Sequence, residues 1–168
     1  MKRAIIIGCP GSGKSTFARS LHEKTGLPLI YLDMLNWNAD RTTVPREVFR
    51  ERLAEALSGG EWIIDGNYCS TMEQRIAASD TVFFLDYPPE VCMEGILSRR
   101  GTVRPDIPWV ESPDDVDEEF VSFVKNFETE TRPIVLELLR KYSDRTIITF
   151  RLRKEYLHGR GGFLHVAV

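Results

Sequence analysis

Short apolar runs alternate with longer amphipathic stretches along most of the chain. Each apolar run is rich in Ile, Val, Leu or Phe, is bounded by turn residues and is apolar on both faces, which is typical of strands in a parallel sheet. The runs predict five β-strands, at residues 3–7, 28–32, 62–65, 81–85 and 146–150. The alternation therefore predicts an α/β fold in three layers, with a mainly parallel five-stranded sheet between helices on both faces.

The amphipathic stretches between these runs predict helices at residues 14–24, 46–57, 89–100 and 117–142. The last stretch contains Pro133, so we expect it to kink there or to form two helices. Residues 100–116 are the least regular part of the chain and contain three prolines, which indicates a loop or lid. Because no repeat or low-complexity linker interrupts the pattern, we expect a single domain over residues 1–168.

Composition narrows the class of protein. The 168 residues carry 22 basic and 25 acidic side chains, which gives a formal net charge of −3. The longest apolar run falls far short of the roughly 20 residues that a membrane helix needs, and the run after Met1 ends at Gly8, too soon for a secretion signal. Three cysteines without C-x-x-C spacing argue against a disulfide framework and a structural zinc site. We therefore expect a cytoplasmic protein with no membrane segment.

One motif carries most of the functional information. Between the first predicted strand and the first predicted helix stands Gly8-Cys9-Pro10-Gly11-Ser12-Gly13-Lys14-Ser15, followed by Thr16, which matches the phosphate-binding pattern G-x-x-x-x-G-K-[ST]. The glycines let backbone N–H groups turn toward a phosphate where a Cβ would collide. We expect Lys14 to reach the β- and γ-phosphates of ATP, Ser15 to ligate Mg²⁺ and Thr16 to approach the α-phosphate. A glycine-rich turn that only caps a helix would not require the Lys-Ser pair, so the motif predicts a P-loop that binds Mg·ATP.

Four further segments, together with this motif, resemble those of a known protein family. They are Trp-Ile-Ile-Asp-Gly-Asn-Tyr at 62–68, Phe-Leu-Asp-Tyr-Pro at 84–88, Arg-Arg at 99–100 and Arg-Pro-Asp at 104–106. With residues 8–16, they resemble the adenylate-kinase-like P-loop nucleoside and nucleotide kinases, and more closely the family of DNA topology modulation proteins. The resemblance spans most of the chain, from Met1 to about Phe150. It implies a three-layer P-loop NTPase fold and a small kinase, while the family name records a phenotype and implies no contact with DNA.

Asp65 matches an aspartate that faces the nucleotide in adenylate kinases. The resemblance implies that Asp65 helps Ser15 to hold Mg²⁺ through water; the alternative is a turn aspartate that caps the helix near Ser70. Two residues further on stand Asn67 and Tyr68, where adenylate kinases carry Phe-Pro-Arg, and that arginine holds an acceptor phosphate. This departure weakens the case for a nucleoside monophosphate acceptor and leaves open a nucleoside or another small hydroxyl compound.

Asp33 is the candidate for handling the acceptor. It is predicted at the end of the second strand, beside the first strand, so we expect its carboxylate to point into the crevice at the carboxyl ends of the strands. There it would accept the proton of an acceptor hydroxyl or orient that hydroxyl. The alternative is an ordinary strand-to-loop aspartate, and Trp37 nearby is either a stacking wall or a core residue. Residues 33–60 form the predicted acceptor-binding segment.

Arginines gather around the same predicted crevice. Candidates to reach the acceptor are Arg41, Arg46, Arg50 and Arg75, although solvated helix arginines are common. Candidates to neutralise the moving phosphoryl group are the lid arginines Arg99, Arg100 and Arg104, together with Arg132 on the following helix. The acidic stretch at residues 111–119 is either a solvated helix start or a device that holds the lid arginines away from the site. No lid metal is predicted.

The sequence as a whole predicts a phosphotransferase that moves the γ-phosphoryl group of Mg·ATP to a nucleoside, nucleotide or other small acceptor. The alternative is a nucleotide-dependent regulatory protein that influences DNA topology without robust kinase activity. Sequence-independent binding to DNA needs clustered positive charge, and a chain of net charge −3 with mixed signs offers little of it. We therefore expect ATP and a small molecule as partners, not nucleic acid, for either a monomer or a homodimer.

Overall fold

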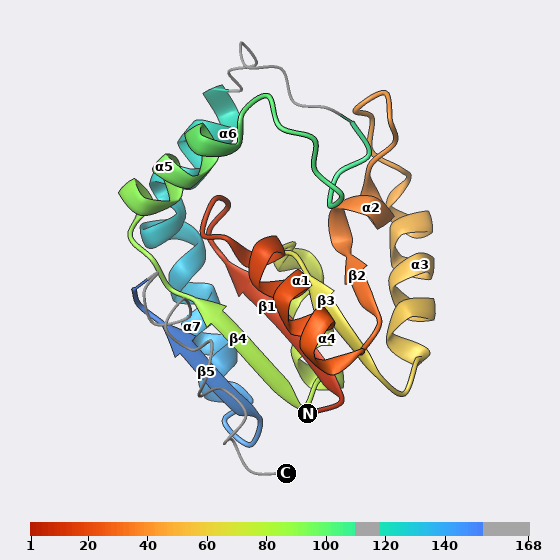
Figure 1. Ribbon diagram of the computed structural model, residues 1–168. Helices are drawn as coiled ribbons and strands as arrows, with labels where there is room; N and C mark the ends of the chain where they lie inside the picture. Colours follow the sequence, from red (N-terminus) through yellow and green to blue (C-terminus); the bar gives the residue numbers. More distant parts are fainter. Residues whose placement is uncertain (110–117, 153–168) are drawn as a thin grey trace.

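A computed structural model of the protein describes residues 1–109 and 118–152. Part of the predicted lid (residues 110–116), most of the acidic stretch at 111–119 and the C-terminal segment 159–168 lie outside the described residues. In the described part, a five-stranded parallel sheet with the order β2-β3-β1-β4-β5 forms the centre of the molecule (Figure 1). This sheet confirms the predicted α/β class.

The strands coincide with the predicted apolar runs to within one residue at each end. They are β1 (Arg3–Gly8), β2 (Leu29–Tyr31), β3 (Trp62–Asp65), β4 (Thr81–Leu85) and β5 (Thr146–Phe150). The central strands β1, β3 and β4 are buried on both faces apart from Arg3 at the start of β1, which explains why their sequences show no polar alternation.

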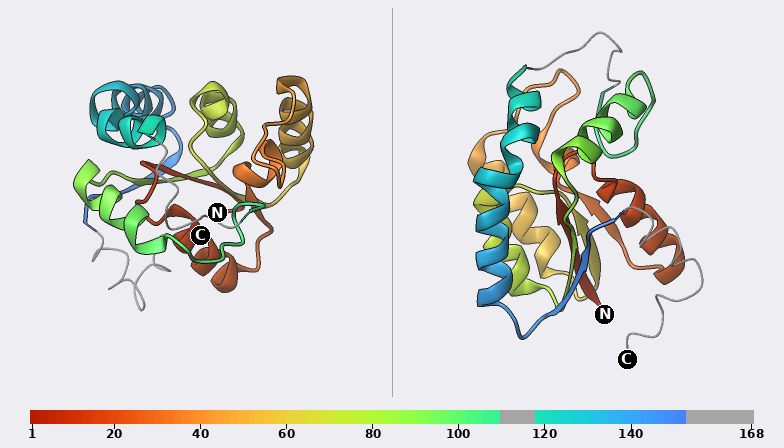
Figure 2. Two further views of the ribbon diagram at one scale, coloured as in Figure 1. Left: turned by 90° about the horizontal axis from the view of Figure 1, so that it is seen from above. Right: turned by 90° about the vertical axis from the view of Figure 1, so that its left-hand side faces the viewer.

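Helices cover both faces of the sheet, so the molecule has three layers (Figure 2). On one face lie α1 (Lys14–Thr25) and α5 (Pro89–Arg99); on the other lie α3 (Arg46–Ser58), α4 (Cys69–Ala78) and α7 (Arg132–Lys141). In the described part of the chain, no helix combines the length and the apolar character needed to cross a membrane.

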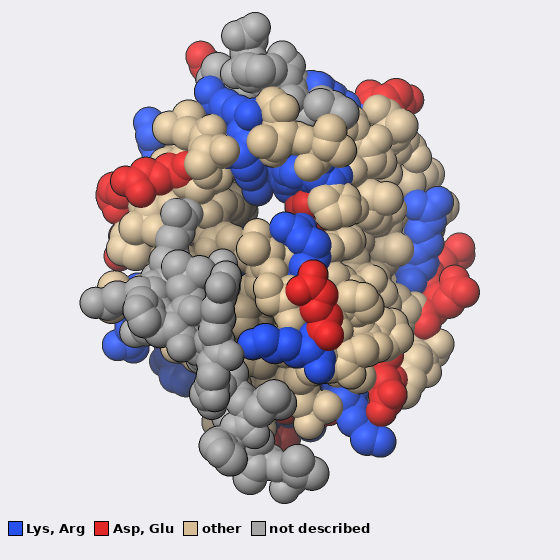
Figure 3. Space-filling view, in the orientation of Figure 1, with Lys and Arg blue, Asp and Glu red and all other residues tan. Residues whose placement is uncertain are grey.

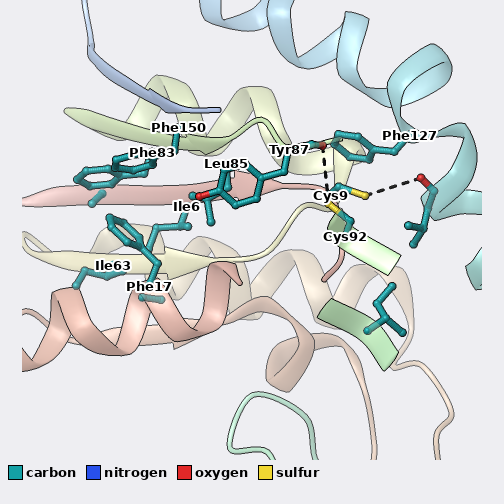
Figure 4. Packing of buried hydrophobic residues seen from close by; sticks show 14 of the residues in the cluster. Ile6, Cys9, Phe17, Ile63, Phe83, Leu85, Tyr87, Cys92, Phe127 and Phe150 are labelled. Carbon is teal, nitrogen blue, oxygen red and sulfur yellow. Dashed lines mark hydrogen bonds between the residues drawn. The ribbon is translucent and has the colours of Figure 1, made fainter. Parts of the chain in front are cut away.

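Two apolar cores separate the sheet from these helices. Alternate residues of β1 serve each core, so that Ile6 packs toward α1 and α5 while Ile5 packs toward α3, α4 and α7. In the first core, the ring of Phe17 from α1 lies 5.0 Å from that of Phe83 and 5.5 Å from that of Phe150 (Figure 4). This packing fixes α1 against the sheet and therefore fixes the loop between β1 and α1.

The predicted helix at 117–142 is interrupted, as its proline indicated, but the break lies upstream of Pro133. Helix α6 (Glu118–Asn126) is followed by a π-helical turn η1 (Phe127–Thr131) and then by α7. Pro133 lies in the first turn of α7, where a residue without an N–H removes no helical hydrogen bond. The two helices on either side of this π-helical turn pack into different cores. Val124 of α6 lies in the first core, whereas Val135 of α7 lies in the second.

The structure corrects the predicted setting of Asp33 in two respects. Strand β2 ends at Tyr31, and Asp33 lies in the first turn of a short helix, α2 (Leu32–Asn36). Strand β2 is also an edge strand beside β3, which separates it from β1. Leu32, the first residue of α2, is fully buried and packs so closely on Gly66 that a Cβ at Gly66 would lie 2.8 Å from the Cβ of Leu32. The turn that carries Asp33 is thereby held against the loop after Asp65.

Candidate functional site

The predicted P-loop joins β1 to α1, and its geometry requires glycine. Gly11 has a φ of +83°, and a Cβ at this position would lie 2.0 Å from the carbonyl oxygen of Cys92 on α5. Gly13, with a φ of +93°, is the N-cap of α1, and no side chain makes a capping hydrogen bond at this helix end. The amides of the first turn of α1 are therefore available to bind an anion.

Side chains of the loop divide between the site and the core. The Lys14 ammonium reaches back across the loop and donates a hydrogen bond to the carbonyl oxygen of Cys9 at 3.1 Å. The Cys9 side chain points into the core instead, where its sulfur lies beside Cys92 and 3.9 Å from the carbonyl oxygen of Val124 (Figure 4). A hydrogen bond with the neighbouring Cys92, together with burial, raises the pKa of the Cys9 thiol. Cys9 therefore offers its backbone to a ligand and keeps its thiol in the core.

A cavity of about 440 Å³ opens over the P-loop. Its walls come from the loop with the first turns of α1, from the end of α5 and from the chain that follows α5. The lining includes residues 11–16 and 102–106, together with Arg19 and Arg99. Figure 3 shows this hollow near the middle of one face, with Lys and Arg side chains along its rim. Such a concentration of cations in an acidic chain suits a polyphosphate ligand.

Asp65 is buried at the end of β3, with 5% of its surface exposed. Burial raises its pKa to about 6, against the opposing effects of the Lys14 charge and the Ser15 hydroxyl. Its Oδ1 atom has no hydrogen-bond partner among the described residues. The alternative role as a helix cap is wrong, because α4 begins at Cys69 without any side-chain capping hydrogen bond. The Asp65 carboxylate therefore faces the P-loop.

Asp106 is a second carboxylate at the P-loop, although the sequence alone predicts no role for it. It is 3% exposed and lies in the loop after α5. Burial raises the pKa of Asp106, but the hydrogen bond and charge of Arg104 outweigh that effect and, with the Ser15 hydroxyl, hold the pKa below its usual value. Arg19 on α1 lies 3.9 Å from the same carboxylate. Asp106 thus connects the lid to the P-loop and to α1.

A chain of hydrogen bonds fixes Asp33. The indole N–H of Trp37 donates to the Tyr68 hydroxyl at 3.0 Å, and that hydroxyl donates to Oδ1 of Asp33 at 2.7 Å. Burial raises the pKa of Asp33, while the Tyr68 hydrogen bond and the charges of Lys14 and Arg104 oppose the rise. The charge of Lys14 acts on Asp33, so Asp33 lies near the P-loop, and it does so from α2. Trp37 is half-buried, so it is not a core residue.

The predicted lid arginines occupy different environments. Arg99 and Arg104 line the cavity, and Arg104 donates hydrogen bonds to Asp106. Arg100 is the half-buried C-cap of α5. Arg132 makes a two-pronged ion pair with Asp86 at 2.7 and 2.8 Å, at the end of β4. The structure therefore brings Arg99 and Arg104 to the P-loop and holds Arg132 against the sheet.

The arginines predicted to reach the acceptor are exposed or bonded to backbone in the structure. Arg41, Arg46 and Arg50 are exposed. Arg75 is fully buried and donates to the carbonyl oxygens of Gly66, Asn67 and Tyr68 at 2.9 to 3.0 Å. These bonds satisfy the guanidinium group and shape the loop after β3. The expected contact between Arg75 and an acceptor is thus replaced by a structural role.

Comparison with known proteins gives a consistent picture. No family model matches the chain. It is 27% identical to an adenylate kinase of Leptospira biflexa serovar Patoc over 167 residues, covering 80% of this chain and 84% of the relative. It is 31% identical to an adenylate kinase of Mycobacterium leprae over 108 residues, covering 60% of this chain and 58% of the relative. A crystal structure of shikimate kinase from Bacteroides thetaiotaomicron matches with a TM-score of 0.51 and 19% identity, covering 89% of this chain and 85% of that one.

The fold is that of P-loop kinases. The similarity to adenylate kinases supports a P-loop kinase-like nucleotide phosphotransferase and leaves its acceptor unspecified. The closer resemblance to DNA topology modulation proteins stays a prediction.

The oxygen donors beside the P-loop fit Mg²⁺, as expected for a P-loop kinase fold. The Asp65 carboxylate has an oxygen without a hydrogen-bond partner, and the Ser15 hydroxyl lies beside it. Within residues 1–109 and 118–152, no group of three or more His, Cys, Asp or Glu side chains forms a metal site by itself. Protein-bound Mg²⁺ usually keeps several waters and takes one or two carboxylates plus substrate phosphates, so a magnesium site of this kind does not need three such side chains.

Proposed function

We propose that this protein transfers the γ-phosphoryl group of Mg·ATP to a small-molecule acceptor in the cytoplasm. The observation that carries the proposal is that Lys14 and Ser15 of the P-loop line the same cavity as Arg99, Arg104 and Asp106. A site that only bound a nucleotide would not need guanidinium groups on the opposite wall, whereas a phosphoryl transfer does, because negative charge spreads over the moving group.

The P-loop would bind the phosphates of ATP, the phosphoryl donor. The open amides at the start of α1 and the Lys14 ammonium would hold the β- and γ-phosphates, with the exposed Thr16 near the α-phosphate. Ser15 would hold Mg²⁺ directly and Asp65 would hold it through water. When bound, Mg²⁺ supplies positive charge that offsets the charge developing on the phosphate oxygens.

Asp33 would act on the phosphoryl acceptor. In the transfer, an acceptor hydroxyl oxygen forms a bond to the γ-phosphorus while the bond from that phosphorus to the bridging oxygen of ADP breaks. Asp33 takes the hydroxyl proton, and burial favours its protonated form because it raises the pKa of Asp33. Arg99 and Arg104 would neutralise the negative charge of the transferred group, and Arg100 lies next to Arg99 in the chain. Arg132 would act indirectly, through its ion pair with Asp86.

The test is ADP release from Mg·ATP, measured with a panel of nucleosides, nucleoside monophosphates and small hydroxy acids. We expect acceptor-dependent ADP release by the wild type. Lys14→Ala should reduce it by about 100-fold or more, the usual effect of removing one preorganised electrostatic group. Lys24→Ala provides the matched control, because Lys24 is an exposed residue in the last turn of the same helix.

Equal ADP release by the wild type and Lys14→Ala would contradict the proposal. A panel on which no compound stimulates ADP release, combined with Lys14-dependent binding of ATP, would favour the nucleotide-dependent regulatory protein instead.

A further inference from the structure

We propose that the acceptor is a hydroxyl compound without a phosphate group, and that its hydroxyl binds Asp33, which Tyr68 positions. This inference rests on the proposed function and names its substrate class. It is drawn from the side chains that the fold places at the acceptor end of the crevice: a carboxylate, a tyrosine hydroxyl and two tryptophans.

The hydrogen bonds of Tyr68 have a fixed direction. The Trp37 indole nitrogen is a donor only, so it occupies a lone pair of the Tyr68 hydroxyl, and the tyrosine proton turns to Oδ1 of Asp33. Burial and the Asp33 charge raise the pKa of Tyr68, so this proton stays on the tyrosine. Phe49 packs on the Tyr68 ring with a centroid distance of 5.2 Å. One oxygen of Asp33 is therefore engaged and its orientation is set, which leaves the other oxygen to accept a hydroxyl proton.

The charges near Asp33 disfavour a phosphate there. Asp106 raises the pKa of both Asp33 and Asp65, and Asp33 also raises the pKa of Asp65, so the three carboxylates repel one another. The cations that oppose them, Lys14 and Arg104, lie on the P-loop and in the lid, on the donor side. A phosphate monoester carries up to two negative charges and would add to this repulsion.

The arginines predicted to reach an acceptor are either bonded to the loop after β3 or exposed at the surface. The Arg75 guanidinium donates hydrogen bonds to the loop carbonyls of residues 66–68. The side chains of Arg41, Arg46 and Arg50 are exposed. Beside Tyr68, the partly exposed rings of Trp37 and Trp109 meet edge to face at 5.5 Å. The wall next to Asp33 is therefore aromatic, which suits the carbon skeleton of an uncharged compound.

The first test compares alcohols with their own phosphates. ADP release is measured with adenosine, thymidine and glucose, and with adenosine 5′-monophosphate, thymidine 5′-monophosphate and glucose 6-phosphate. We expect at least one alcohol to exceed its phosphate by about tenfold or more in kcat/KM. Asp33→Asn should lower the alcohol rate by about 100-fold or more, as expected for loss of a general base. Asp144→Asn, at an exposed position, is the control.

The outcomes separate this inference from the proposed function. Preference for the phosphates, or a monophosphate rate that Asp33→Asn leaves unchanged or raises, would overturn the inference and leave the kinase in place. Lack of stimulation by all six compounds would count against both.

The second test isolates the positioning role of Tyr68 through the pH profile of kcat/KM. The Tyr68 hydrogen bond lowers the pKa of Asp33, so Tyr68→Phe should raise that pKa and move the acid limb of the profile to higher pH. The other charged groups that interact with Asp33 are Lys14, Arg104, Asp106 and Asp65, and the variant leaves all four in place. Tyr142→Phe removes a hydroxyl from an exposed hydrogen bond with Glu73 and should leave the acid limb unmoved. An unmoved acid limb in Tyr68→Phe would overturn the role of Tyr68.

Discussion

Asp65 is a buried carboxylate whose charged form lowers the stability of the folded protein. Its carboxylate is 5% exposed, and one of its oxygens has no hydrogen-bond partner within the described residues. A side chain selected only for stability would be neutral there, because burial of a charge without full pairing is unfavourable. The nearby Lys14 and Ser15 offset only part of this cost, since the pKa of Asp65 still rises to about 6.

The raised pKa of Asp65 should make the stability of the protein depend on pH. The pKa of Asp65 is about 6 in the folded protein against an ordinary value of 3.8, so the folded state binds more protons than the unfolded state between these values. Stability therefore falls as the pH rises through this window, and the cost is complete above about pH 6. Asp65→Asn should raise the free energy of unfolding at pH 7.5 by up to about 3 kcal/mol and flatten its fall between pH 4 and 6.

Urea unfolding at a series of pH values measures this effect. Asp144→Asn, at an exposed site, should change neither the free energy nor its pH dependence. A destabilised Asp65→Asn variant at pH 7.5 would show that the buried carboxylate holds the fold together and would remove the argument that it is retained for ligand binding.

At the scale of elements, the P-loop depends on the helix that packs on it. The backbone of α5 approaches Gly11 so closely that a Cβ would lie 2.0 Å from the carbonyl oxygen of Cys92 and 2.8 Å from the Ile96 side chain. Because Arg99 is on the same helix, this contact also sets the position of Arg99 relative to the loop. The position of this wall of the cavity is therefore tied to the loop by close packing.

Substitution of Gly11 tests this contact. Gly11→Ala should lower the free energy of unfolding by about 3 kcal/mol, from the steric overlap with α5 together with the strain of a positive φ. Gly60→Ala should stay within about 0.5 kcal/mol of the wild type, because a Cβ at Gly60 has nothing within 4 Å. Chemical denaturation measures both. Equal stability of the two variants would mean that the loop and α5 move apart easily.

Elements differ in how far the sequence determines them. The strands and the longer helices were predictable because their apolar spacing is local, and the P-loop because its residues are consecutive. Helix α2 has only five residues, too few to show a period, so the sequence predicts Asp33 at the end of a strand and not in a helix. The π-helical turn at Phe127–Thr131 reflects packing against two different cores, which no local pattern encodes.

The candidate site was predictable in part for the same reason. The P-loop and Asp65 stand in recognisable motifs, whereas Tyr68 and Asp106 take their roles from partners far away in the chain. Tyr68 bonds to Asp33, 35 residues earlier, and was visible only as a departure from adenylate kinases. Asp106 follows Arg104 by two residues, a spacing that signals an ion pair only once the loop is known to fold over Ser15.

At the scale of the whole molecule, the sheet explains how one acidic chain binds an anion. The carboxyl ends of β1 and β3 lead directly to the P-loop and to Asp65, while α2 and the loop after α5 bring Asp33 and Asp106 to the same crevice. Cations gather inside, at Lys14 and the cavity arginines, in a chain whose net charge is −3. This distribution favours a small polyphosphate over a nucleic acid, which would need an extended basic surface.

The most direct test of the central claim follows the γ-phosphate itself. With ATP labelled at the γ-phosphorus, Mg²⁺ and an acceptor from the panel, the label is separated into organic product and inorganic phosphate for the wild type and Lys14→Ala. Phosphoryl transfer predicts that most of the released label is in an organic product and that Lys14→Ala releases about 100-fold less. Release of the label only as inorganic phosphate, or release that does not depend on Lys14, would contradict the account.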